Sequence, residues 1–116
     1  SLNTTMLCHW VRDRTRGPKL PLEYVVRKMT HDGARLYGMN DRGLLKVGKR
    51  ADINVIDYDR LNLGRPEMHF DLPSGAPRMH QSSTGYLATM VNGVVTRRFD
   101  ADTGARPGRL YRSRPN

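Results

Sequence analysis

A cluster of charged side chains lies just before an alternating apolar segment near the middle of the chain. Lys49, Arg50 and Asp52 immediately flank the start of residues 53–56. Side chains of these types could take part in acid–base chemistry. They could equally hold a turn in place, because Asp52 can accept hydrogen bonds from turn amides or pair with Arg42 or Arg50. We expect the structural role.

The histidines do not form a recognisable metal motif. There are four of them: His9, His31, His69 and His80. They form neither His-x-His nor His-Glu-x-x-His, and Cys8 and His9, as neighbours in a predicted helix, point about 100° apart. His69 and His80 lie eleven residues apart with Asp71 between them, so a metal site there is an alternative to ordinary surface or packing histidines. We expect the ordinary role, and for His9 a place on a helix flank.

Nucleophile and phosphate motifs are equally weak. Cys8 has no visible base or electropositive surroundings, which a reactive thiolate needs. The run from Ser82 to Gly85 lacks the glycine pattern of a nucleophile elbow, and the glycines of the chain do not form a phosphate-binding loop. We therefore predict no catalytic, cofactor-binding or metal-binding residue in this chain.

The net charge of +9 raises the question of an anionic partner. Arginines are concentrated near the C-terminus: Arg97, Arg98, Arg106, Arg109, Arg112 and Arg114. Residues 32–38 are nevertheless too short for a recognition helix, and no aromatic stacking platform accompanies the arginines. No apolar run approaches the ~20 residues that span a bilayer. We expect no membrane or specific nucleic-acid partner, and keep a standalone basic nucleic-acid- or anion-binding module as the alternative.

Short helices are predicted for the first forty residues. Residues 6–11 have the apolar spacing of one helix face, with Thr4 or Thr5 as a cap and an end at Gly17. A second apolar stripe covers residues 22–29, and we expect two short helices to meet at Thr30. A stop is predicted at Gly38.

Strands are predicted for the remainder. Gly43 and Gly48 allow turns, and residues 53–56 alternate as in a strand with one buried face. Residues 61–81 are dense in glycine, proline, asparagine, aspartate and serine taken together, so we expect a long surface loop there with at most brief extended pieces. Residues 85–99 form a predicted hairpin around Asn92–Gly93, and residues 109–111 a short extended piece. This is an α+β chain with too few strands to close a barrel or complete a sandwich.

Four segments in this order resemble the amidohydrolase superfamily, in its N-acyl-D-amino-acid deacylase (D-aminoacylase) branch. They are "LPLEYVVRKMTHDGARLYGM", "DRGLLKVGKRADINVID", "YLATMVNGVVT" and "TGARPGRLYR". The resemblance implies that residues 1–40 are terminal helical elements of a TIM-type barrel. Residues 41–116 would be the C-terminal share of a small, incomplete β-sandwich. It also implies that the chain, which starts at Ser1, is a C-terminal fragment of the enzyme.

The resemblance further implies a hydrolase in which one or two zinc-type ions activate a water that attacks the amide carbonyl of an N-acyl-D-amino acid. The metal ligands and the proton-transferring aspartate belong to barrel strands whose motifs do not occur here, so no catalytic residue carries over. We expect the fragment alone to be inactive and to bind no metal. Its partners would be the N-terminal part of the same protein and, through unpaired sheet edges, a second copy. The single cysteine suits the cytoplasm.

Overall fold

The first helical segment is amphipathic and continuous in the computed structural model, which describes residues 1–112. It consists of α1 (Leu2–Thr5) and the wider turns of η1 (Met6–Asp13), and buries Leu7 and Cys8. The predicted capping threonine is wrong, because the helix already begins at Leu2. The Thr5 hydroxyl instead donates to the Ser1 carbonyl at 3.1 Å. The segment also ends at Asp13, before the predicted stop at Gly17.

The second helical segment is also continuous. It comprises α2 (Leu22–Arg27), η2 (Lys28–Asp32) and α3 (Gly33–Leu36). The prediction of two helices meeting at Thr30 is wrong, because the Thr30 hydroxyl donates to the Val26 carbonyl one turn earlier, at 2.7 Å, and does not cap a new helix. Gly38 ends the segment as predicted, with a φ of +67°.

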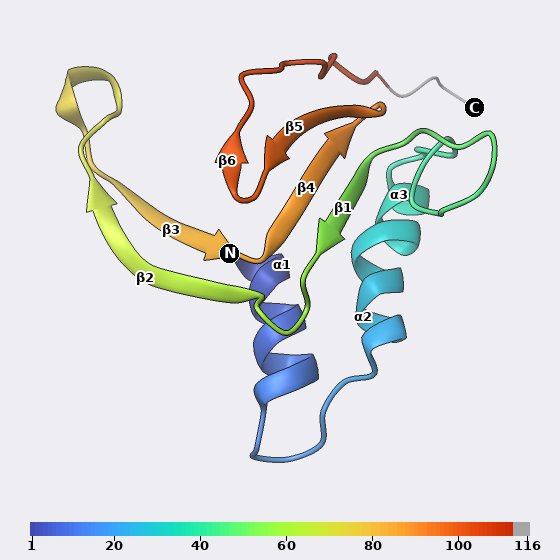
Figure 1. Ribbon diagram of the computed structural model, residues 1–116, viewed down its shortest axis with the longest axis horizontal. Helices are drawn as coiled ribbons and strands as arrows, with labels where there is room; N and C mark the ends of the chain where they lie inside the picture. The colour runs from blue at the N-terminus through green and yellow to red at the C-terminus, as the bar shows by residue number, and fades with distance from the viewer. Residues whose placement is uncertain (113–116) are drawn as a thin grey trace.

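An antiparallel sheet follows, made of β1 (Ile53–Ile56), β4 (Tyr86–Val91), β5 (Val94–Arg98) and β6 (Ala101–Asp102). Within the described residues its strand order is β1-β4-β5-β6 (Figure 1). The predicted hairpin is confirmed: Asn92 and Gly93 join two of these strands with φ values of +51° and +79°. The extended piece predicted at residues 109–111 is not a strand.

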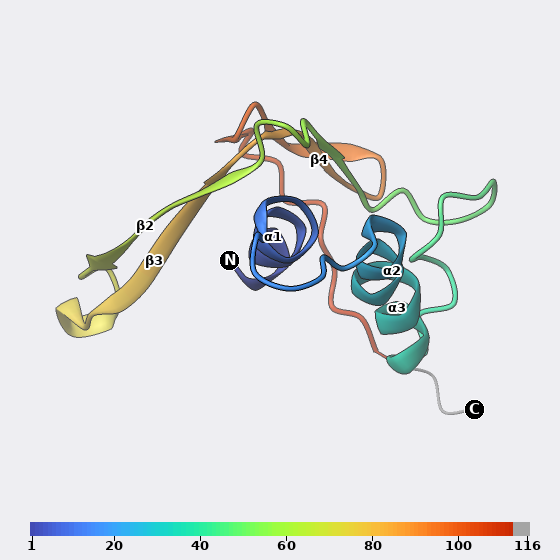
Figure 2. The same cartoon turned by 90° about the horizontal axis from the view of Figure 1, so that it is seen from below.

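A second antiparallel hairpin replaces the predicted long loop. Its strands are β2 (Asn62–His69) and β3 (Arg78–Thr84), joined through the short turn η3 (Pro73–Gly75). Pro66 lies within β2 and is tolerated there because a strand of a two-stranded ribbon always has an unpaired edge. The hairpin reaches away from the helical segments, which lie together on one side of the strands (Figure 2).

The buried core is small and lies where the helical segments meet the start of β2. Leu61 is fully buried and Val25 is 1% exposed, and both pack with Leu7 and Cys8. The backbone of Leu61 crosses directly over Gly85, where an added Cβ would lie 2.7 Å from the Leu61 Cα. Many large apolar side chains stay exposed. The α+β prediction is confirmed, with open sheets and little core.

The helices of the described part are too short and too polar to cross a membrane.

Candidate functional site

Asp52 joins three parts of the chain. One carboxylate oxygen pairs with the Arg42 guanidinium at 2.9 Å, and the other pairs with Arg50 at 2.9 Å. The second oxygen also accepts the backbone N–H of Asn92, in the β4–β5 turn, at 2.8 Å. The contacts proposed from the sequence are therefore present, and Asn92 is the turn residue that supplies the amide.

The electrostatics of Asp52 follow from these contacts. Partial burial opposes ionisation of its carboxyl, but the Asn92 amide and the guanidinium groups of Arg50 and Arg42 outweigh that penalty. The pKa of Asp52 therefore lies below its ordinary value. A carboxylate held ionised by two cations is a poor general base at neutral pH and a good anchor for a turn.

The side chain of Lys49, the remaining charged candidate, also forms a hydrogen bond with the backbone. Its ammonium donates to the carbonyl of Asn40. Gly43 is needed nearby because its φ is +84° and a Cβ there would lie 2.8 Å from the Ala34 Cβ. The corner from Asn40 to Asp52 thus fastens the end of α3 to the sheet.

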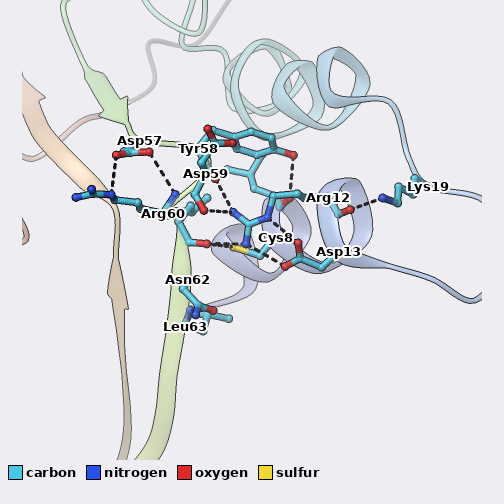
Figure 3. Close-up of polar contacts among 12 residues, drawn as sticks. Cys8, Arg12, Asp13, Lys19, Asp57, Tyr58, Asp59, Arg60, Asn62 and Leu63 are labelled. Carbon is cyan, nitrogen blue, oxygen red and sulfur yellow. Dashed lines mark hydrogen bonds and ion pairs between the residues drawn. The ribbon is translucent and has the colours of Figure 1, made fainter.

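A second polar junction, centred on Arg12, ties η1 to the connection between β1 and β2 (Figure 3). The Arg12 guanidinium donates to the Leu61 carbonyl at 2.9 Å and to the carbonyls of Tyr58 and Asp59. It also pairs with Asp13 at 2.7 Å. The sequence pattern gives no sign of these three carbonyl partners of Arg12, because they lie 46 to 49 residues away along the chain.

Substituting Arg12 by alanine is expected to lower the free energy of unfolding by about 1–2 kcal/mol. A hydrogen bond from a charged donor contributes more to stability than a neutral one. Here that contribution is reduced because the Arg12 side chain is partly exposed. Thermal unfolding followed by circular dichroism checks this. The matched control is Arg35→Ala, an exposed arginine of α3, which should change the melting temperature little. Equal losses in both variants would contradict the role given to Arg12.

Cys8 has the properties of a structural cysteine. Its buried thiol donates to the Leu61 carbonyl at 3.2 Å. Burial raises the pKa of the Cys8 thiol, and the nearby Arg12 offsets this only in part. The thiol is therefore protonated at neutral pH, unlike a nucleophilic cysteine.

Two of the histidines are brought together and the others are not. The rings of His69 and His80 stack across the β2–β3 hairpin with centroids 4.6 Å apart. Asp71 does not join them but pairs with Arg78 at 2.6 Å. His9 lies edge-on to the neighbouring Trp10. Within residues 1–112, no group of three side chains is arranged to hold a metal ion.

The other sequence candidates fall on strands and on the basic tail. Ser82 and Thr84 belong to β3, so no strand–turn–helix elbow surrounds them. Arg106 pairs with Asp102 at 2.7 Å and, with the Gly104 amide, lowers the pKa of that carboxyl to about 2. Part of the cationic tail is therefore neutralised within the chain. Arg114 lies outside the described residues.

Comparison with known proteins identifies the family. Residues 3–97 match the amidohydrolase family. The chain belongs to this family, as its sequence resemblance predicted. It is 36% identical over 110 residues to an N-acyl-D-glutamate deacylase of Alcaligenes xylosoxydans xylosoxydans. That match covers 94% of this chain and 20% of the relative, so the chain spans about a fifth of the relative's length. No solved structure matches the chain significantly.

Proposed function

We propose that this chain is part of a metal-dependent amidohydrolase that hydrolyses the amide bond of N-acyl-D-amino acids. The observation that carries the proposal is the similarity, along nearly the whole chain, to a protein named an N-acyl-D-glutamate deacylase. The substrate would be a small N-acylated D-amino acid and the products an amino acid and a carboxylic acid.

The contribution of this chain to that enzyme is structural. Residues 1–40 supply terminal helical elements of the catalytic barrel and residues 41–116 the C-terminal share of the small β domain. Support comes from the exposed edge strand β1 and from large apolar side chains left in solvent, such as Leu36, which is 80% exposed. The partner would be the rest of the same polypeptide. Self-association through unpaired edges would accompany its absence, and we place the enzyme in the cytoplasm.

The metal chemistry belongs elsewhere in that enzyme. Members of the family are generally metal-dependent, and one or two zinc-type ions would activate the attacking water. The described residues do not fit such a centre, because no three potential ligands converge among them. We therefore derive no catalytic step through this chain, and assign the metal ligands and the proton-transferring aspartate to other segments of the enzyme.

The alternative, a standalone basic nucleic-acid- or anion-binding module, is favoured by one observation, the net charge of +9. It predicts tight binding to DNA that weakens steeply with salt. Several of the cations, among them Arg42, Arg50 and Arg106, are engaged by carboxylates of the same chain. For this reason we prefer the amidohydrolase assignment.

An enantiomer-resolved assay tests the proposal. The complete polypeptide that contains this segment is purified with its metal and offered N-acetyl-D-glutamate, other N-acetyl-D-amino acids and their L enantiomers. Release of free amino acid from D substrates only, abolished by a chelator, is expected, and the isolated 116-residue chain should be inactive. Failure of the metal-loaded polypeptide on every D substrate would overturn the assignment. Tight, sequence-selective DNA binding by the chain would favour the alternative.

A further inference from the structure

The β2–β3 hairpin has one apolar and one polar face. Its register places Met68 opposite Met79, and Glu67 opposite His80. Because side chains alternate along a strand, Pro66 shares one face with the two methionines, and Glu67 and His80 share the other. We call the face formed by Pro66, Met68 and Met79 the methionine face. Met68 is 52% exposed and Met79 is 64% exposed, so the described residues leave this face uncovered.

The methionine face lies on the same side of the hairpin as the core. Ser83 and Gln81 are two residues apart on β3, so they share a face. Their partners on β2, Leu63 and Pro66, therefore share that face too, although a bulge separates them. Leu61, two residues before Leu63, points the same way and is buried against the helical segments. The methionine face thus continues the surface that packs Leu61 into the core.

Two contacts at the bulge agree with this assignment of the faces. A Cβ added to Gly64 would lie 2.3 Å from the Ser82 Oγ, so both of these bulge positions point to the opposite side. Gln81, the polar residue on the side of the methionines, donates its side-chain amide to the Gly64 carbonyl at 3.1 Å. Its amide therefore already has a partner beside the uncovered apolar surface.

Residue 1 lies near the base of the hairpin. α1 contacts β2, and the Thr4 hydroxyl lies 2.7 Å from the hydroxyl of Tyr86, the first residue of β4. Figure 2 shows the hairpin bending toward the side on which the helices lie, with residue 1 on the side of α1 that faces the hairpin. Chain that precedes residue 1 in a complete polypeptide would therefore enter the space beneath the hairpin.

We propose that the methionine face is buried in the complete enzyme, against the part of the same polypeptide that precedes residue 1. The inference rests on the proposed function, in which this chain is the C-terminal share of a longer enzyme. The match covers 20% of the relative, so most of the relative's length lies outside it.

The chemistry of the hairpin suits such a contact. Methionine side chains adapt to irregular apolar surfaces. Phe70, which is 68% exposed and follows the end of β2, adds to the uncovered apolar surface. The opposite face, with Glu67 and His80, stays in solvent. A second copy of the chain is the less suitable occupant, because it would have to displace polypeptide that starts beside this face.

Thiol accessibility in the complete polypeptide tests this surface. Met68→Cys and its matched control, Glu67→Cys, place thiols at adjacent positions on opposite faces. Each variant reacts with a maleimide in native buffer and in urea, and mass spectrometry locates the label. At position 68 the native reaction should be at least about tenfold slower than the reaction in urea, because a buried thiol reacts only when the site opens locally. At position 67 the two rates should differ little. Equal native rates at the two positions would overturn the inference.

Oxidation of the unchanged polypeptide keeps the test independent of variant folding. Hydrogen peroxide converts accessible methionine to its sulfoxide. Met68 and Met79 should both be oxidised much more slowly in the native polypeptide than in the polypeptide unfolded in urea. Native oxidation of both residues at the unfolded rate would contradict burial of the methionine face.

A photo-crosslinker attached to the thiol at position 68 identifies the occupant. Crosslinks to sequence that precedes residue 1, in a product that migrates as one polypeptide on a denaturing gel, are expected. A product of two polypeptides would assign the face to a second copy and refute the inference. None of these readouts involves amide hydrolysis. A protected face in an inactive polypeptide would count against the proposed function alone, and an exposed face in an active one against this inference alone.

Discussion

Replacing Leu61 by alanine is expected to lower the free energy of unfolding by about 3 kcal/mol, within the ~2–5 kcal/mol typical of such core truncations. Leu61 is fully buried and packs against both helical segments. Its removal leaves a cavity that cannot collapse easily, because the Leu61 backbone is fixed by Arg12 and by its close approach to Gly85. Urea denaturation followed by circular dichroism measures the loss.

An exposed leucine provides the matched control. Leu45 is 86% exposed, so Leu45→Ala removes the same atoms without removing buried contacts. Its effect should stay within about 0.5 kcal/mol. If the two substitutions destabilise the chain equally, the core does not lie where the helical segments meet the start of β2.

The substitution Asp52→Ala is expected to destabilise the chain by about 2 kcal/mol without removing catalysis. It breaks the pairs with Arg42 and Arg50 and leaves the Asn92 amide without its acceptor. In the complete enzyme the melting temperature should fall, while activity per folded molecule stays nearly unchanged. A large loss of turnover with normal stability and metal content would show that Asp52 takes part in chemistry after all.

The loss of stability caused by Asp52→Ala should depend on pH in a defined direction. The folded-state pKa of Asp52 lies below its unfolded value, so its stabilisation is fully present above the unfolded pKa of about 3.9. It is lost as the pH falls through the folded-state pKa. The stability gap between the original chain and Asp52→Ala should therefore close in acid. Asp59→Ala, which removes an exposed carboxylate from the neighbouring turn, should show no comparable gap.

The elements that the sequence predicted correctly are those with strong local signals. Helical spacing around Val25 and the Asn92–Gly93 pair each encode a structure within a few residues. The β2–β3 hairpin was missed because its prolines and glycines resemble loop composition, and cross-strand pairing over such a distance leaves no local signal. Thr30 was misassigned as a cap because its hydroxyl can bond either to a new helix start or back to Val26, and tertiary context decides.

The difference between local and long-range contacts also explains which contacts of the site were predictable. Arg50 and Asp52 are two residues apart, so their pairing follows from the sequence alone. The Asn92 amide reaches Asp52 from 40 residues away, and Arg12 reaches the Leu61 carbonyl across 49 residues. Those contacts exist only once the strands and helices are assembled, and no spacing rule predicts them.

The close approach of the Leu61 backbone to Gly85 fixes the direction in which the long β2–β3 hairpin leaves the core. The eight residues of β2 extend about 26 Å from that crossing, and Gly85 leaves no side chain between the two backbones. The alignment of the hairpin tip, with its methionines and histidines, is therefore set by the contact of two backbones at its base.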